Sequence, residues 1–218
     1  MARPDGKRLK KQERRRTPAL RSNREIQAVS IYPVFDWESR YGSLCLSPVR
    51  PISETLLDAD HPARLFHCFW EALPRAPLPE RSTLDPRRFP ALLKWFMILE
   101  REVALGADER GKGEESGPGI DYRVRLHGTA AAQMMYEDQT GRRLSEFCEG
   151  ECLRSRLVAM ETTLREARPV FGRSTITGHG KATVEVSLGM FPFTGRDESS
   201  PQILVVAAPT DRMLRLSM

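Results

Sequence analysis

Residues 121–129 read DYRVRLHGT, and this stretch does most to decide the fold class. Apolar and polar side chains alternate along it, which is typical of a strand with one buried face. The apolar side chains, assigned to the core, are Tyr122, Val124 and Leu126, and the polar ones, assigned to the outer face, are Arg123, Arg125 and His127. Gly128–Thr129 then leads into AAAQMMYEDQ, a helix-forming segment over residues 130–139 that Thr140–Gly141 closes. The stretch therefore predicts a strand that runs directly into a helix.

A second strand is predicted before this one, over Trp95–Val103 (WFMILEREV). Residues 105–120, between the two strands, contain five glycines, a proline and many charges, the composition of a solvated loop. Further upstream, Asp60 or His61 is placed to cap a helix over residues 62–73, with Pro62 in its first turn. The proline-rich segment after that helix allows only a turn or a short helix near residues 85–93.

Downstream, the pattern predicts a short helical piece over residues 144–147 and a longer helix over residues 151–167. In the longer helix Leu153, Leu157, Met160 and Leu164 recur at helical spacing, and Pro169 ends it. Three strands follow over residues 170–177, 182–193 and 203–208, joined by turns. This order predicts an α+β fold: a five-stranded antiparallel sheet with helices on one face, preceded by the N-terminal helix.

The positive charge of the chain is concentrated at its start. The net charge is +5, and residues 1–25 carry ten Lys or Arg against three acids. With few apolar residues, this basic tail is expected to be disordered. Some of its cations are candidates for contact with phosphates of nucleic acid or of an anionic membrane, namely Lys10, Lys11, Arg14, Arg15 and Arg16. A solubilising extension without a binding role is the simpler alternative.

The remaining boundaries follow from composition. Residues 26–60 show no sustained period and are expected to form an irregular connector, residues 61–210 the domain, and residues 211–218 a C-terminal tail. No apolar run is long enough to cross a bilayer, and the basic N-terminus lacks the apolar stretch of a secretory signal. A cytoplasmic protein is therefore expected. Its four cysteines, Cys45, Cys68, Cys148 and Cys152, are then expected to be reduced thiols.

The order of helices and strands resembles a PAS domain. The residues that carry the resemblance, over roughly residues 62–210, are Trp70, Pro79, Leu84–Asp85–Pro86, Pro90 with Leu92–Leu93, Tyr122–Thr129, Thr140–Gly141–Arg142, Pro169–Val170 and Phe191–Pro192–Phe193. Together they are similar to a bacterial subfamily of stand-alone PAS domains. The resemblance implies a sensory or interaction module with no reaction of its own.

The motif search agrees with a role other than catalysis, since the sequence has no P-loop, zinc-protease or nucleophile-elbow signature. Light-sensing PAS relatives need a cysteine where Arg142–Arg143–Leu144 stands, which argues against flavin photochemistry. The helix over residues 151–167 has no axial histidine for haem. Cys148 and Cys152 share a helix face without two further metal ligands, so no metal site is predicted. The identity of any cofactor stays open.

Two kinds of binding surface are predicted. A ligand pocket between sheet and helices would be lined by Tyr122, Val124, Leu126, Met134, Leu157, Val184, Val186 and Leu188. The same side chains would equally fill a solid core, which is the preferred interpretation. Contact with a partner is expected through one face of the N-terminal helix (Leu65, Phe66, Phe69 and Trp70) or through the outer sheet face (Arg123, Arg125 and Glu185). For the helix, the alternative is that it caps its own domain.

The leading hypothesis is therefore a non-enzymatic PAS-like sensory module. It would relay a signal by self-association as a homodimer or by binding a separate signalling protein, with or without a small-molecule ligand. The alternative is a phosphate-binding adaptor whose basic tail contacts nucleic acid or an anionic membrane.

Overall fold

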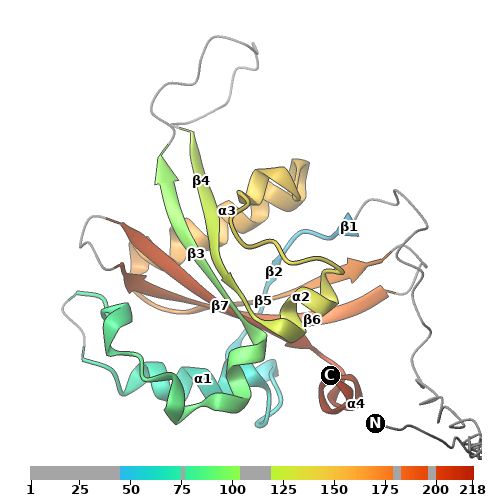
Figure 1. Cartoon of the computed structure of the whole chain (residues 1–218), viewed down its shortest axis with the longest axis horizontal. Helices are drawn as coiled ribbons and strands as arrows, with labels where there is room; N and C mark the ends of the chain where they lie inside the picture. Colours follow the sequence, from blue (N-terminus) through green and yellow to red (C-terminus); the bar gives the residue numbers. More distant parts are fainter. Residues whose placement is uncertain (1–44, 75–76, 104–118, 179–182, 196–199) are drawn as a thin grey trace, which may run out of the picture. The chain divides into compact units, whose positions relative to one another are not determined.

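The described strands form one antiparallel sheet (Figure 1). A computed structural model describes residues 45–74, 77–103, 119–178, 183–195 and 200–218. In these residues the strand order is β1-β5-β6-β7-β3-β4, with β2 also paired to β5. The long strands are β3 (Phe96–Val103), β4 (Ile120–His127), β5 (Val170–Thr177), β6 (Thr183–Thr194) and β7 (Pro201–Pro209). The predicted α+β class and the five predicted antiparallel strands are confirmed, and the short strands β1 and β2 bring the described sheet to seven strands instead of five.

From Cys45 onward the chain is more regular than the irregular connector expected over residues 26–60. β1 (Cys45–Leu46) and β2 (Arg50–Pro51) pair with β5 at the sheet edge, and the 3-10 helix η1 (Glu54–Leu56) follows. Gly172 of β5 permits this close approach, because a Cβ there would lie 2.5 Å from Cγ1 of Val49. Residues 26–44 and the basic tail before them lie outside the described residues.

Helix α1 (Pro62–Glu71) covers one face of the sheet with aromatic side chains. Phe66 is fully buried and meets Phe96 and Phe191 in edge-to-face contacts, with ring centroids 5.0 and 4.8 Å away. One turn further on, Nε1 of Trp70 donates a hydrogen bond to the carbonyl of Pro192 at 3.2 Å. These contacts fix α1 on its own sheet.

The cap of α1 is His61, one of the two residues predicted for this role. Its Nδ1 accepts a hydrogen bond from the backbone N–H of Ala63 at 3.2 Å, and Pro62 occupies the first turn. After α1, the helices in the described part of the proline-rich segment are all 3-10 helices: η2 (Arg81–Thr83), η3 (Pro86–Arg88) and η4 (Pro90–Trp95). The short helix expected near residues 85–93 is therefore two 3-10 turns.

Helix α3 (Gly150–Glu166) lies on the opposite side of the sheet from α1 (Figure 1), so the prediction that the helices lie on one face is wrong. Consecutive strand residues point to opposite faces, so Phe191 of β6 packs against α1 while its neighbour Met190 packs in one cluster with Met160 of α3. The predicted stripe of α3 packs against this same cluster, through Leu153, Leu157, Met160 and Leu164. The 3-10 helix η5 (Leu144–Glu146) precedes α3 where a helical piece was expected.

Helix α2 (Thr129–Met134) ends well before residue 139, the predicted end. Two residues after it, Tyr136 adopts a left-handed backbone conformation with φ of 60°, which stops the helix. Its ring packs where Gly178 has no side chain, since a Cβ at Gly178 would lie 2.2 Å from the ring. Tertiary packing thus overrides the helix propensity of this segment.

A bulge in the β3–β4 hairpin corrects the predicted faces of β4. The register shifts between Ile98 and Leu99, so Leu126 is paired with Ile98 while Val124 is paired with Leu99. One extra residue in β4 reverses the alternation beyond it. Leu126, assigned to the core, is 39 % exposed, and His127, assigned to the outer face, is buried and accepts a hydrogen bond at Nδ1 from the backbone N–H of Gln139.

The C-terminal residues form a helix, α4 (Arg212–Ser217), where a tail was expected over residues 211–218. Asp211 caps it by accepting a hydrogen bond from the N–H of Met213 at 2.7 Å. Arg215 is buried and pairs with Asp58 at 2.8 Å and Asp60 at 3.2 Å, two residues just before α1. Among the described helices, none combines the length and apolar character needed to cross a membrane.

The cysteines also differ from the expectation of four reduced thiols. Cys148 and Cys152 form a disulfide across the start of α3, with their Cα atoms 6.2 Å apart. Cys45 and Cys68 are free and exposed. The spacing of four residues, which places two thiols on one helix face, is what brings this pair together.

Candidate functional site

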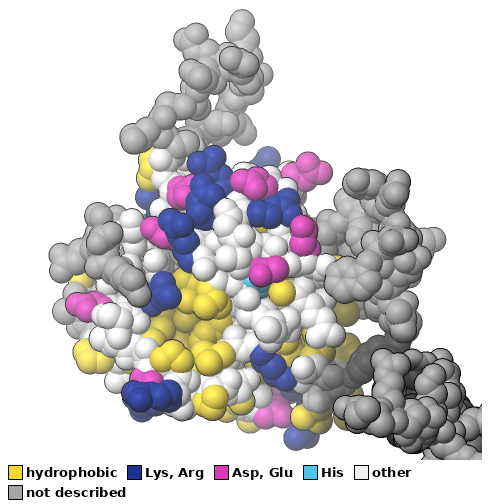
Figure 2. Space-filling model, in the orientation of Figure 1, with side chains coloured by type: hydrophobic (Ala, Val, Ile, Leu, Met, Phe, Trp, Pro, Cys, Tyr) yellow, Lys and Arg dark blue, Asp and Glu magenta, His cyan; other side chains and the backbone are white. Residues whose placement is uncertain are grey.

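An apolar groove opens between the proline-rich 3-10 helices and the paired ends of β3 and β4. Its volume is about 700 Å³, within the range of about 300–1,000 Å³ that is typical of small-molecule pockets. We define the apolar groove by its apolar lining residues, which are Leu84, Pro86, Phe89, Pro90, Leu93, Phe96, Ile98, Leu126 and Leu204. Figure 2 shows apolar side chains gathered on this face of the molecule.

Local sequence explains why the groove stays open. Prolines hold the 79–90 segment in short turns that cannot cover the sheet as a long helix would. The bulge turns Leu126 outward, where it forms one wall of the groove. The chain passes close to η4 at Gly128, where only glycine fits because a Cβ would lie 2.5 Å from the carbonyl oxygen of Leu93. The prolines, the bulge and Gly128 therefore shape the groove together.

The charged side chains that line the apolar groove are cationic. Arg81 and Lys94 both line it, and no Asp or Glu is among the lining residues. Lys94 extends its ammonium over the ring of Trp95, 5.0 Å from the centroid. His127 also lines the groove, and burial lowers the pKa of its imidazole, which keeps the ring neutral near pH 7. The charged residues in the groove lining are thus of the kind that attract an acidic ligand.

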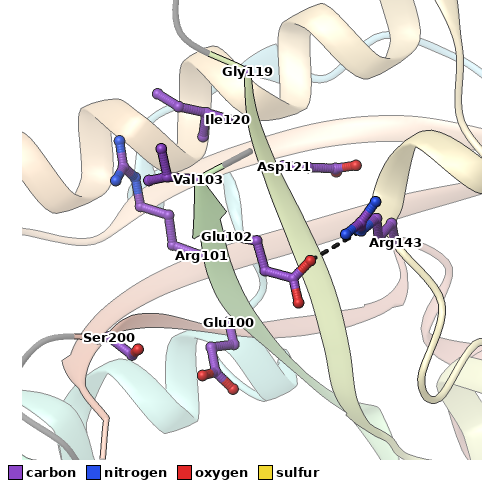
Figure 3. A pocket seen from close by; sticks show the side chains of 9 residues that line it. All are labelled: Glu100, Arg101, Glu102, Val103, Gly119, Ile120, Asp121, Arg143 and Ser200. Atoms are coloured by element: carbon purple, nitrogen blue, oxygen red, sulfur yellow. Dashed lines mark hydrogen bonds and ion pairs between the residues drawn. The ribbon is translucent and has the colours of Figure 1, made fainter. Parts of the chain in front are cut away.

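A second, charged pocket of about 500 Å³ lies at the outer ends of β3 and β4 (Figure 3). Glu102 sits between two arginines there, 2.5 Å from Nε of Arg123 and 2.9 Å from Nε of Arg143. The hydrogen bond from Arg123, helped by Arg143, lowers the pKa of Glu102. Glu100 pairs in the same way with Arg125. The charges of this pocket neutralise one another, so it stabilises the hairpin more readily than it holds a ligand.

Beneath this pocket, on the α3 side of the sheet, a half-buried polar group links strand and helix. Glu161 of α3 accepts hydrogen bonds from the Tyr122 hydroxyl at 2.6 Å and from Nε of Arg101 at 2.8 Å. Burial and the Glu161 carboxylate raise the pKa of Tyr122. Burial alone would raise the pKa of Glu161, but the hydrogen bonds from Arg101 and Tyr122 lower it. Figure 3 shows Arg101 directed away from Glu102, to this other face.

Of the predicted ligand-pocket residues, only Leu126 lines either of the two described pockets. Most are packed into the two hydrophobic clusters, and these are Tyr122, Val124, Met134, Leu157, Val184, Val186 and Leu188. Leu126 lines the apolar groove instead, because of the bulge.

The predicted interaction residues fall into two groups. On α1, Phe66 and Trp70 are buried in their own domain and Phe69 is half-buried against Phe89, while Leu65 is 41 % exposed. On the sheet, Arg123, Arg125 and Glu185 are all in ion pairs, the last with Arg173 at 3.8 Å. The phosphate-contact candidates Lys10, Lys11, Arg14, Arg15 and Arg16 lie outside the described residues.

The groove residues were missed at the level of sequence, apart from Leu126. Leu84, Phe89 and Leu93 recur among prolines without a helical period, and this pattern of apolar residues that no regular element can bury was the available signal. In the part of the chain that the structure describes, no cluster of three His, Cys, Asp or Glu side chains is placed to hold a metal ion.

Comparison with known proteins agrees with this architecture. The model of the PAS domain family matches residues 59–207, which is well over half of the chain. No curated protein matches the chain. The match starts just before α1 and ends within β7, so it spans the α1 layer, the five long strands and α3. The chain therefore belongs to the PAS domain family, whose members are sensory or interaction modules.

Proposed function

We propose that this chain is a non-enzymatic signalling module that binds a separate signalling protein through the apolar groove. The observation that carries the proposal is the groove itself, an apolar surface lined by Arg81 and Lys94 and by no carboxylate. Concave surfaces lined mainly by apolar side chains with a few charged groups are common binding sites. The proposal requires neither haem nor flavin.

The occupant that fits this surface is a short segment with two or more apolar residues flanked by Asp or Glu. Apolar side chains would cover Leu84, Leu93 and Leu126, and the acidic flank would meet Lys94 and Arg81. A segment bound this way gains specificity from charge and affinity from burial.

Two observations support a separate partner over self-association, the first at α1 and the second at the groove. The two largest aromatic side chains of that helix, Phe66 and Trp70, are already buried against its own sheet. A second copy would offer this basic, apolar groove another basic, apolar groove, and like charges facing each other oppose such pairing.

The non-enzymatic part is supported by the state of the candidate acids and bases. Glu100 and Glu102 are held by arginines, and Glu161 is held by Arg101 and Tyr122. A general base needs access to its substrate and a pKa near the working pH, and the lowered pKa values of Glu102 and Glu161 move them away from that range.

The test is a selection of random twelve-residue peptides displayed on phage, with the purified full chain as the bait. We expect the selected peptides to share apolar residues flanked by Asp or Glu. Leu126→Glu places a carboxylate at the edge of the groove, and its binding to a selected synthetic peptide should fall at least about tenfold. Val158→Glu is the matched control, because Val158 is 61 % exposed on α3, away from the groove lining, and this variant should bind normally.

Light scattering on the same samples tests whether a second copy of the chain occupies the groove instead. A concentration-dependent dimer that Leu126→Glu abolishes would assign the groove to a second copy and reject a separate partner. Selected peptides with no shared pattern, or with binding that Leu126→Glu leaves unchanged, would reject the groove as the site.

A further inference from the structure

The disulfide at the start of α3 sits beside a buried arginine. Cys148 is 4 % exposed and follows η5, and Cys152 is half-buried in the first turn of α3. One turn further along the helix, Nη1 of Arg156 lies 2.7 Å from Sγ of Cys152. A guanidinium in contact with a cysteine sulfur is the environment that stabilises a thiolate.

Arg156 has no acidic partner among the described residues. Its guanidinium donates to the carbonyl oxygens of Ser47 at 2.9 Å and Cys152 at 3.1 Å and to the hydroxyl of Ser174 at 3.0 Å, all of them neutral. The residue is 9 % exposed, and burial lowers the pKa of its guanidinium to about 10. A buried cation without a counter-charge is costly, so this site would gain from an anion at Cys152.

We propose that Cys148 and Cys152 form a reversible redox site, with the thiolate of Cys152 paired to Arg156 in the reduced form. This inference goes beyond the proposed function and rests on different residues. The N-terminus of α3 adds a favourable dipole at Cys152. The charged neighbours on the same turn are Glu149 and Glu151, both exposed, and Glu151 is paired with Arg154. The facing groups from the sheet edge, Ser47 and Ser174, are uncharged.

The chemistry requires an external dithiol as reductant and a peroxide as oxidant. In reduction, the dithiol breaks the S–S bond and closes to its own disulfide, Cys148 takes one proton, and the second proton leaves to solvent while Cys152 remains a thiolate. In oxidation, the thiolate of Cys152 attacks the peroxide and becomes a sulfenic acid, with water formed after uptake of one proton. The thiol of Cys148 then displaces a second water and the S–S bond re-forms.

The site is connected to the sheet edge that β1 and β2 build. Arg156 donates a hydrogen bond to the carbonyl oxygen of Ser47. The hydroxyl of Ser155 accepts a hydrogen bond from the backbone N–H of Val49 at 3.0 Å. If Arg156 turns toward a thiolate, its bond to Ser47 competes with the new ion pair. Reduction is therefore expected to loosen residues 45–51 from α3.

The experiment uses the full chain with Cys45→Ser and Cys68→Ser, both exposed positions, so that only the proposed pair reacts. After peroxide treatment, intact-mass measurement should show the loss of two hydrogens, restored by dithiothreitol. In a Cys148→Ser version of this chain, the rate of alkylation of Cys152 by iodoacetamide should follow a pKa well below about 8.5, the value of an unperturbed thiol. A profile centred near that value would overturn the proposal.

Variants of the arginine sharpen the test. Arg156→Met should lower the alkylation rate at pH 7 by about tenfold or more, through loss of the counter-charge. Arg154→Met is the control, since Arg154 is exposed on the same helix and pairs with Glu151, and it should leave the rate unchanged. Equal effects of the two substitutions would contradict a specific role for Arg156. If Arg156→Met does not fold, the pH profile of the chain that retains Arg156 still decides the matter.

Discussion

The two faces of the sheet are packed with different chemistry. Against α1 the contacts are aromatic, with Phe66 at their centre. Against α3 the packing includes the Tyr122–Glu161–Arg101 group, the buried Arg156 and a disulfide. The packing energy of close-packed phenyl rings does not depend on pH, because these rings carry no titratable group. The energy of a buried polar group or a cysteine pair changes when the group is protonated or oxidised. The comparison teaches that the α1 face is stabilised mainly by aromatic packing, whereas the α3 face also contains polar groups and cysteines whose charge or oxidation state can change.

The strongest test of this comparison removes the centre of the aromatic face. Phe66→Ala should lower the free energy of unfolding by about 3–5 kcal/mol, because it leaves a cavity among rings that cannot close over it. Leu65→Ala on the same helix is the control and should cost about 1 kcal/mol or less, since Leu65 is 41 % exposed. Urea unfolding of both variants measures the difference. Similar losses would mean that α1 is not the stabilising layer.

The second test uses pH at the start of α1. Burial and the nearby Arg215 lower the pKa of His61 to about 4. The histidine pKa in the unfolded chain is near 6.5, so between about pH 4 and pH 6.5 the unfolded chain binds a proton at this residue and the folded chain does not. Stability should therefore fall as the pH drops from about 6.5 to about 4, by about 3 kcal/mol from this group, and show no further loss from it below pH 4.

The matched variant for this test is His61→Asn, which retains a side-chain oxygen able to cap α1. The part of the pH dependence that belongs to His61 should disappear in it. Urea midpoints measured from pH 4 to pH 8 give both curves. Parallel curves for the two proteins would show that His61 does not titrate as described.

The third test addresses the polar group on the α3 face. Tyr122→Phe removes the hydroxyl that donates to Glu161 and should cost about 2 kcal/mol, because the acceptor is a half-buried carboxylate. The same substitution in a Glu161→Gln background should cost less, since the charged acceptor is gone. A double-mutant cycle by urea unfolding measures the coupling, and a coupling near zero would contradict the assigned network.

The smallest effect is expected at the outer sheet surface. Arg125→Ala breaks the ion pair with Glu100, in which the arginine is 45 % exposed, and should change stability by less than about 1 kcal/mol. The change should shrink further in 1 M salt. Thermal unfolding at low and high salt is sufficient. A loss as large as that of Tyr122→Phe would remove the distinction between surface and buried charge.

The elements of the fold were predictable where local pattern and tertiary packing agree. The stripe of α3 describes one buried face, so this helix was found close to its observed ends. β6 was also found close to its observed ends, although it is buried on both faces from Val186 to Phe193. Helix α4 was missed because six residues give too short a period, and its anchor, the pairing of Arg215 with Asp58 and Asp60, joins distant parts of the chain.

The candidate site was less predictable because it depends on one extra residue. The alternation of β4 gave Tyr122 and Val124 their correct face, but no residue type announces the bulge opposite Ile98 and Leu99. Beyond the bulge, Leu126 and His127 exchange places, and with them one wall of the apolar groove. The disulfide was missed for a different reason. Reduced thiols were predicted from the expected cytoplasmic location, and the helical spacing that brings Cys148 and Cys152 together was given less weight.

The hydrogen bond from Trp70 to Pro192 gives the protein a spectroscopic handle. Trp70 and Trp95 are both buried in the aromatic layer, while Trp37, the third tryptophan, lies outside the described residues. With Trp37→Phe, all indole emission comes from the α1 side of the sheet. Loss of that layer then appears as a red shift of the emission, so that its unfolding can be timed separately from events at the cysteines beneath the other face.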